Sequence, residues 1–158
     1  MTGTIRQVTP AVLEIHVTLQ RLAEIHGVLD DLIAALSARR FSAREIFGVR
    51  LAVDEALVNA VEHGHRGDPH KMVRIVYWVR PEHILILVED EGMGFDSAGI
   101  ADPRDAENLD RPRGRGLLLM KRFMTWIRHN ERGNRVAMCK RRAEPADLGM
   151  RLRQFQAL

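Results

Sequence analysis

A long amphipathic helix with a clear beginning is the feature that most constrains what this chain can fold into. Ser42 and Glu45, three residues apart, match the pattern of a capping box, in which each side chain binds the backbone N–H of the other residue. Apolar residues then recur at helical spacing as far as Gly64, a residue type that commonly ends a helix in the left-handed conformation. We therefore expect one helix over residues 42–64, with one face buried in a core.

A polar arc runs along that expected helix. Because an α-helix advances about 100° per residue, four of its polar side chains point within about 100° of one another. These are Glu55, Asn59, Glu62 and His63. Two small residues, Gly48 and Ala52, fall on the same side and leave room beside them. The arc is either the solvated stripe of an ordinary core helix or part of a binding site.

The composition is that of a globular domain. The chain has 158 residues, of which 46% are hydrophobic and 28% are charged. It contains no apolar run long enough to span a membrane and no export leader, so we expect a cytosolic protein. Cys139 is the only cysteine, which excludes an intrachain disulfide and a thiolate metal site. His63 and His65 lie close together without an evident third ligand, so we expect solvated loop histidines rather than a metal site.

The charge is distributed unevenly along the chain. Residues 1–100 carry 10 basic and 14 acidic side chains, whereas residues 101–158 carry 14 basic and 7 acidic ones. A basic end of this kind suits nucleic acid, an acidic protein, a polyphosphate, or simply solvent. It contains few aromatic residues on which bases could stack, which counts against nucleic acid.

The hydrophobic pattern predicts an alternation of strands and helices. Strands are expected within residues 4–18 and over 71–80, 84–88, 126–130 and 136–140, and helices over about 22–39, over 42–64 and over 117–124. Residues 84–88 are apolar on both faces, which favours an inner strand joined by a tight hairpin to the strand before it. Residues 97–112 show no periodicity, and a loop of that length is typical of a lid or a binding loop. The polar segment 143–158 is either a short packed helix or a frayed tail, so the expected domain covers residues 1–142.

The inner strand runs directly into an acidic stretch that contains two glycines. Asp90 stands at the end of the strand, and Gly92 and Gly94 follow it. The sheet would hold this carboxylate in place, where it can accept a hydrogen bond from an exocyclic amine, and the glycines would let a ligand approach the backbone. The alternative is a simple acidic turn.

A second glycine pair stands at the beginning of the expected helix 117–124. Gly114 and Gly116 would present free N–H groups to an anion there, and Arg115 and two arginines before it add positive charge. The pair is not a Rossmann fingerprint, because Leu119 stands where a third glycine or alanine belongs and no strand leads in. The chain also has no Walker-type phosphate loop and no protein-kinase motif set.

Taken together, three stretches resemble, in order and spacing, the N, G1 and G2 boxes of the Bergerat-type GHKL ATPases, which include gyrase, Hsp90, histidine-kinase catalytic domains and MutL. They are 54–64 (DEALVNAVEHG), 90–96 (DEGMGFD) and 114–120 (GRGLLLM). Within this group the chain is most similar to the anti-sigma factor serine kinases of the RsbW and SpoIIAB type. The resemblance covers about residues 11–142 and implies an α+β fold, a two-layer α/β sandwich of helices over a mixed, mostly antiparallel sheet. The length leaves no room for a histidine-kinase dimerisation helix pair or a gyrase transducer domain.

The resemblance also implies a role for individual residues. Asn59 would ligate the Mg²⁺ that bridges the phosphates of ATP, and Glu55, one turn earlier, would act as the general base. Asp90 would accept a hydrogen bond from the adenine amine. The other cofactor-binding residues would be Gly92 and Gly94, which let the base pack close, and the lid residues Gly114, Arg115 and Gly116. These roles agree with the chemistry of phosphoryl transfer, which depends on positioning and on charge neutralisation.

One position departs from the family pattern. Related proteins often have a threonine just after the glycine of the last hairpin, where it supports the adenine contact. This chain has Asn134 after Gly133. Asparagine can also form hydrogen bonds, so whether Asn134 replaces the threonine is left open.

The function that the resemblance implies is that of a cytosolic ATP-dependent serine/threonine kinase that is also an anti-sigma factor. It would phosphorylate a STAS-type antagonist, sequester a sigma factor, and exchange these partners according to its nucleotide state. The family's usual homodimer is implied, and neither nucleic acid nor a membrane is expected as a direct partner. Two alternatives are an ATP-dependent binding module without phosphotransfer and a detached histidine-kinase catalytic domain. The presence of Glu55 counts against the first, and the lack of a phosphoacceptor helix pair counts against the second.

Overall fold

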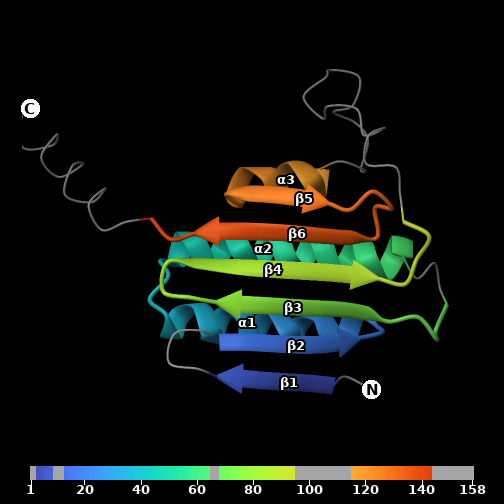
Figure 1. Cartoon of the computed structure of the whole chain (residues 1–158), viewed down its shortest axis with the longest axis horizontal. Coiled ribbons are helices and arrows are strands. Elements are labelled where there is room, and N and C mark those ends of the chain that lie inside the picture. Colours follow the sequence, from blue (N-terminus) through green and yellow to red (C-terminus); the bar gives the residue numbers. More distant parts are fainter. Residues whose placement is uncertain (1–2, 9–12, 65–67, 95–114, 144–158) are drawn as a thin grey trace, which may run out of the picture.

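The computed structural model describes residues 3–8, 13–64, 68–94 and 115–143. In this part of the chain, helices cover one face of a six-stranded sheet with the strand order β1-β2-β3-β4-β6-β5 (Figure 1). The strands are β1 Gly3–Val8, β2 Leu13–Leu19, β3 Val73–Val79, β4 His83–Asp90, β5 Trp126–His129 and β6 Arg135–Arg141. The two-layer α+β sandwich expected from the sequence is therefore confirmed. Every pairing between these strands is antiparallel, where the prediction had allowed for a mixed sheet.

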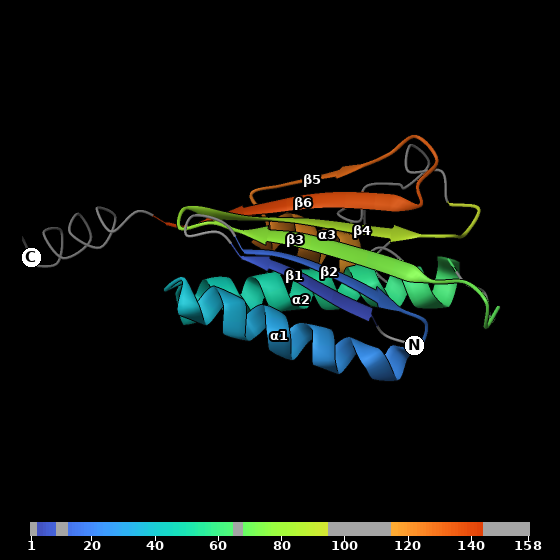
Figure 2. The ribbon, with the colours of Figure 1, turned by 60° about the horizontal axis from the view of Figure 1, so that its bottom comes forward.

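The helices form a single layer on one side of the sheet. They are the 3₁₀ turn η1 Leu22–Glu24, α1 Ile25–Ala38, α2 Ala43–Asn59, the π turn η2 Ala60–Gly64 and α3 Arg115–Phe123. Figure 2 shows α1 and α2 lying along the same face of the sheet, and α2 packs against both α1 and α3. The helix that the sequence singled out is therefore the central helix of its layer. None of the described helices is long and apolar enough to cross a membrane.

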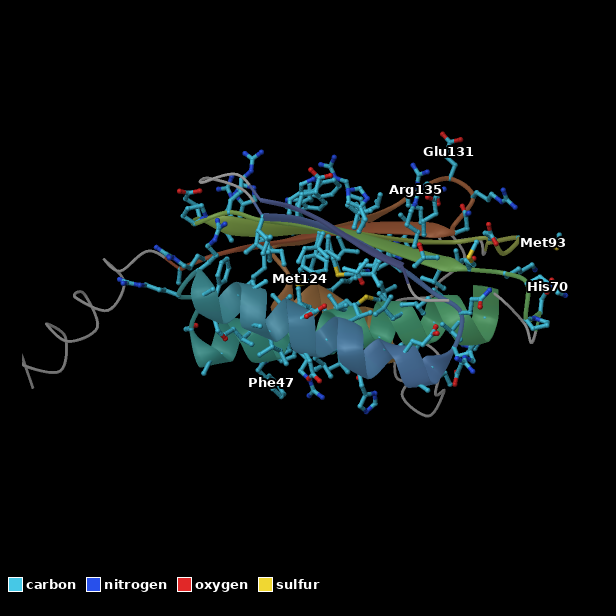
Figure 3. The ribbon with its side chains drawn as sticks, turned by 90° about the horizontal axis from the view of Figure 1, so that it is seen from below. Phe47, His70, Met93, Met124, Glu131 and Arg135 are labelled. Atoms are coloured by element: carbon cyan, nitrogen blue, oxygen red, sulfur yellow. The ribbon has the colours of Figure 1, made fainter. Side chains whose placement is uncertain are left out.

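The core lies between the two layers and is built by alternation along the strands. Ile15 pairs with Tyr77, Tyr77 with Ile86 and Ile86 with Met138, and this cross-strand row is at most 2% exposed. Helix α2 contributes small and branched residues to the same core, namely Val49, Ala52, Val53, Ala56 and Leu57. Figure 3 shows Met124, just after α3, between the sheet and the helices.

Strand β4 is the inner strand that its composition predicted. It pairs with β3 on one side and with β6 on the other, and its tight connection to β3 is closed by a hydrogen bond from Arg80 N to His83 O (2.9 Å). Its core face is fully buried at Ile84 and Ile86, while Leu85 and Leu87 on the other face are half-buried. The central position of β4 fixes where its last residue, Asp90, emerges from the sheet.

The beginning of α2 also agrees with the prediction. Ser42 Oγ accepts a hydrogen bond from Glu45 N (3.3 Å), and Glu45 Oε2 accepts one from Ser42 N (2.7 Å), which completes the capping box. The other oxygen of Glu45 accepts a hydrogen bond from Ala143 N (2.7 Å), just beyond the end of β6. The cap therefore also ties the helix layer to the sheet.

Two predictions about these elements were wrong. The segment 4–18 was predicted to contain one strand, whereas the structure has the antiparallel pair β1 and β2 there. The helix was predicted to run unbroken to 64 and to end in a left-handed glycine. It instead changes to a π turn after Asn59, and Gly64 belongs to that turn without a positive φ. Since a π turn closes i→i+5 hydrogen bonds, the 100° spacing used to place Glu62 and His63 on the arc does not hold beyond Asn59.

Candidate functional site

The candidate site lies at the end of the sheet where β4 stops and the β5–β6 hairpin turns back. Figure 1 shows the end of β4, the beginning of β6 and the end of α2 on the same side of the molecule. In the side-chain view, Met93 from the stretch after β4 and His70 from the stretch before β3 mark that same end (Figure 3). Three segments that are far apart in the sequence thus meet at Asp90.

Two glycines hold the carboxylate of Asp90 in place. Gly92 N donates a hydrogen bond to Asp90 Oδ1 (2.7 Å). A β-carbon built on Gly92 would lie 2.5 Å from that oxygen and 2.6 Å from the carbonyl oxygen of Gly64. A β-carbon built on Gly64 would lie 2.5 Å from Cγ and Oδ1 of Asp90. Since real β-carbons do not approach other atoms so closely, only glycine fits at both positions with Asp90 where it is.

The backbone of Asp90 is fixed from the other side by Asn134. Asp90 N donates to Asn134 O (3.0 Å), and the side-chain Nδ2 of Asn134 donates to Asp90 O (2.8 Å). Asn134 is only 9% exposed, and its Oδ1 accepts a hydrogen bond from Asn130 Nδ2 (2.9 Å). Asn134 therefore supports the backbone of the residue predicted to read adenine, whereas its replacement of the family's threonine in the adenine contact stays a prediction.

The glycine stretch after β4 is shaped by the neighbouring hairpin. Gly94 has a φ of +79°, a region that favours glycine, and a β-carbon there would collide with the carbonyl oxygen of Arg132. Arg132 Nη2 donates a hydrogen bond to Gly92 O (2.9 Å). The backbone bend predicted from Gly92 and Gly94 is thus present and is held against the β5–β6 turn.

Helix α2 contributes the two polar residues that were predicted to act at the phosphates. Glu55 and Asn59 are one turn apart, and both are half-buried. Neither side chain forms a hydrogen bond or an ion pair with any residue that the structure describes. Two half-buried polar groups that no described residue engages, on the helix that leads to Gly64, are candidates for contact with a ligand.

Helix α3 brings Gly116, the second residue of the second glycine pair, to α2. Arg115 is the first residue of α3, and a β-carbon on Gly116 would collide with Glu55 Oε2 and lie 3.2 Å from Glu55 Cδ. The structure therefore brings Gly116 and Glu55 together. Gly114 and the predicted lid loop 97–112 lie outside the described residues.

An ion-pair row lies beside Asp90 on the sheet face opposite the helices. Glu89 pairs with Arg74 of β3 and with Arg135 of β6, which donates from Nε to Glu89 Oε1 at 3.0 Å. Partial burial alone would raise the pKa of Glu89, but the hydrogen bonds from Arg135 and Arg74 and their charge hold its pKa below the ordinary 4.5. Glu89 is therefore charged at neutral pH and fixes the end of β4 across three strands.

The lone cysteine is not part of this chemistry. Cys139 is 5% exposed on β6, and burial raises the pKa of its thiol above the ordinary 9.0, although the charge of Arg141 opposes this. A thiol with a raised pKa is a poor nucleophile at neutral pH. This agrees with the absence of cysteine from the predicted site.

Sequence reasoning did not assign the roles of Gly64 and Gly48. Gly64 was interpreted as a helix end, but it borders Asp90. Gly48 was predicted to leave room beside the polar arc, and that room is filled by Phe123 of α3, whose Cδ1 would lie 2.8 Å from a β-carbon at position 48. The signal in both cases was a glycine within a helix-forming run, where glycine weakens the helix unless packing requires it.

Comparisons with known proteins show which proteins this chain is similar to. Residues 18–140 match the family model described as the histidine kinase-like ATPase domain. The chain is 30% identical over 125 residues to the serine-protein kinase RsbW of Bacillus subtilis, covering 74% of this chain and 78% of that protein. It is 29% identical over 104 residues to the anti-sigma F factor of Clostridium perfringens (61% and 73%), and 30% identical over 95 residues to the serine/threonine-protein kinase BtrW of Bordetella bronchiseptica (59% and 67%).

Proposed function

Because this chain belongs to the histidine kinase-like ATPase domain family, we propose that it is an ATP-dependent serine/threonine kinase and an anti-sigma factor, whose phosphoacceptor is a STAS-type antagonist. The observation that carries the proposal is the carboxylate of Asp90, fixed between Gly64 and Gly92. Helix α2 connects this carboxylate to Asn59 and Glu55 one and two turns back, and no described residue engages either side chain. Base recognition by Asp90 of β4 would thus lie at the end of the helix that carries the residues for phosphate chemistry.

Asp90 would recognise the adenine ring. Gly92 N–H holds Oδ1 in place, and the carboxylate would accept a hydrogen bond from a donor such as the exocyclic amine of adenine. Charge-assisted hydrogen bonds of this kind are among the stronger ones in proteins. The backbone bend at Gly92 and Gly94 leaves no side chain between Asp90 and an incoming base.

Asn59 fits the requirements of a magnesium ligand. Mg²⁺ prefers oxygen ligands and binds through one or two protein groups together with substrate phosphates and water. The carboxamide of Asn59 is half-buried, ends α2 and is not engaged by any described residue, so its oxygen is available. Bound there, Mg²⁺ would neutralise phosphate charge.

Glu55 would act on the acceptor hydroxyl. In the transfer step, the serine oxygen forms a bond to the γ-phosphorus as the bond from that phosphorus to the β–γ bridging oxygen breaks. The hydroxyl proton passes to the Glu55 carboxylate, and ADP carries away the bridging oxygen. No described residue forms a salt bridge with Glu55, so none of them would compete with the proton for its carboxylate.

A homodimer is part of the proposal. The sheet face away from the helices is not covered by any described element (Figure 2). At its centre Leu87 lies between Val76 and Ala137, and Trp126 at the edge is 39% exposed. An apolar face of this kind favours association with a second copy. Light scattering of the wild type should give twice the mass of one chain, and Leu87→Glu should give the mass of a single chain. A monomeric wild type would contradict this part of the proposal.

The proposed kinase activity is tested by phosphotransfer. Purified protein is incubated with Mg-ATP labelled at the γ-phosphate and with STAS-domain proteins from the same genome. We expect acid-stable phosphoserine or phosphothreonine on one of them, and a loss of about 100-fold or more with Glu55→Gln, which cannot accept the proton. A sigma-factor partner, which acts on transcription, would place the reaction in the cytosol.

Three outcomes would contradict the proposal. Transfer at the wild-type rate by Glu55→Gln would remove Glu55 from the mechanism. Acid-labile phosphate would indicate phosphohistidine and a histidine-kinase domain. Nucleotide-dependent partner binding without any transfer would indicate a binding module.

A further inference from the structure

We propose that Gly116 is a positioning residue for Glu55, and that position 116 has no side chain because the Glu55 carboxylate occupies that space. The inference rests on the proposed function, in which Glu55 accepts the proton of the acceptor hydroxyl. It assigns Gly116 a contact with a protein carboxylate, in addition to its predicted place among the phosphate-binding glycines.

The contact involves the functional end of the glutamate. A β-carbon at position 116 would collide with Glu55 Oε2 and lie 3.2 Å from Cδ, but it would lie 3.6 Å from Glu55 Cβ. The first separation is shorter than real β-carbon contacts and the second is unusually tight, whereas the third is an ordinary van der Waals contact. An alanine at 116 would therefore displace the carboxylate while leaving the backbone of α2 where it is.

The position of the carboxylate depends on this packing. Glu55 forms no hydrogen bond or ion pair with the described part of the chain, so no polar partner there fixes its rotamer. The backbone of Gly116 is the boundary against which Oε2 rests. A change at position 116 should consequently move the proton acceptor directly.

A second glycine contact sets the position of α3 on α2. A β-carbon on Gly48 would lie 2.8 Å from Phe123 Cδ1 and 3.0 Å from Phe123 Cβ. Gly48 and Glu55 are separated by the same number of residues as Gly116 and Phe123, about two helical turns in each case. The two helices therefore contact each other at two places that are equally spaced on both, Gly48 with Phe123 and Glu55 with Gly116. The Gly48–Phe123 contact fixes α3 on α2 so that the first turn of α3 lies against the Glu55 carboxylate.

The transfer rate tests the inference through a rescue. Gly116→Ala should lower the single-turnover rate at saturating Mg-ATP by about 100-fold, the order expected when a catalytic group is misplaced by about 1 Å. In a Glu55→Asp background the side chain at position 55 is one methylene shorter. There, Gly116→Ala should lower the transfer rate by less than about threefold. The affinity for ADP should change by less than about threefold in both backgrounds, since Asp90 is untouched.

Melting of the nucleotide-free protein supplies a readout that does not depend on activity. Alanine is a better helix former than glycine, so the substitution should raise the Tm wherever space is available. The control is Gly27→Ala in α1, because nothing lies within 4 Å of a β-carbon there. Gly116→Ala should therefore raise the Tm by less with Glu55 present than in a Glu55→Ala background, where the space beside position 116 is open.

The results separate this inference from the proposed function. Suppose that the wild type transfers phosphate. If Gly116→Ala then lowers the transfer rate by the same factor in the Glu55 and the Glu55→Asp backgrounds, the positioning role is overturned. It is also overturned if Gly116→Ala weakens ADP binding as much as it slows transfer, or if it shifts the Tm equally in both melting backgrounds. If the wild type transfers no phosphate, the proposed kinase function fails, and the catalytic meaning of the contact fails with it.

Discussion

The α-carbon of Gly64 faces the carboxylate of Asp90 so closely that a β-carbon at position 64 would stand 2.5 Å from both Cγ and Oδ1. The two residues come from different layers, because Gly64 ends the π turn after α2 and Asp90 ends β4. A π turn is often found at functional sites, where it re-aims a short segment of a helix. Here it brings the end of the helix that carries Glu55 and Asn59 against the residue proposed to read adenine.

Gly64→Ala should therefore weaken nucleotide binding without unfolding the protein. The new methyl group has to displace the Asp90 carboxylate, so we expect the affinity for ADP to fall about tenfold or more, the equivalent of one charged hydrogen bond. Titration calorimetry measures this, and Gly27→Ala is the matched control. Binding at wild-type affinity by Gly64→Ala would show that the position of Asp90 does not matter.

Asn134→Ala should destabilise the sheet at the site. The substitution leaves the carbonyl oxygen of Asp90 without its 2.8 Å partner and removes the bond to Asn130. Loss of a buried hydrogen-bond partner costs about 1–3 kcal/mol in the free energy of unfolding, measurable by urea denaturation. Glu131→Ala in the same hairpin is the control, since Glu131 is exposed and points away from the sheet (Figure 3). Equal stability of the two variants would contradict the role given to Asn134.

Gly48→Ala should loosen the packing of α3 on α2. Phe123 Cβ would lie 3.0 Å from the new methyl group, and because that atom is next to the backbone the helix itself has to move. Overpacking of this kind costs about 1–3 kcal/mol in the free energy of unfolding, whereas Gly27→Ala should gain about 0.5–1 kcal/mol. Thermal melts of the two variants should shift in opposite directions; a rise in Tm for Gly48→Ala would contradict the packing described here.

The buried cap of α2 predicts a pH dependence. Burial alone would raise the pKa of Glu45, but hydrogen bonds from the Ser42 hydroxyl and from the N–H groups of Ala143 and Ser42, with the charge of Lys140, hold it below the ordinary 4.5. As the pH falls below 4.5, the carboxylate of Glu45 binds a proton more readily in the unfolded chain than in the folded one. The stability that this carboxylate contributes is therefore lost as the pH falls through its pKa in the folded protein.

The comparison variant for this prediction is Glu45→Gln. Both carboxylate oxygens of Glu45 accept hydrogen bonds, so the amide nitrogen of glutamine would face a donor. The wild type should be more stable than the variant at pH 7, and the difference should shrink as the pH falls below 4.5. A difference that stays constant down to pH 3 would contradict the lowered pKa.

Much of the fold was predictable because its signals are local. The capping box of α2 needs only Ser42 and Glu45, and the inner position of β4 follows from apolar residues on both faces. Asp90, Glu55 and Asn59 were selected because a polar residue at a fixed helical or strand position is visible in the sequence. The structure brings Asp90 to η2 at the end of α2, and Glu55 to Gly116.

The remaining features depend on tertiary contacts. Nothing local distinguishes a glycine that ends a helix from one that borders a carboxylate of another layer, so Gly64 was interpreted wrongly as a left-handed end. The π turn likewise arises where η2 meets β4, and the i+4 pattern of the sequence does not contain it. Strand β1 was missed because the antiparallel pairing of Gly3–Val8 with β2 is what defines it.

Calorimetric titration with ADP, in the presence and absence of Mg²⁺, tests the central claim most directly. The account predicts one site per chain, at least tenfold weaker binding by Asp90→Asn under both conditions, and weaker binding by Asn59→Ala only when Mg²⁺ is present. Asp90→Asn should be disruptive because it removes the negative charge and turns one of the two acceptor oxygens into a donor, while Gly92 N–H still requires an acceptor. Wild-type affinity in Asp90→Asn, or no nucleotide binding by the wild type, would contradict the account.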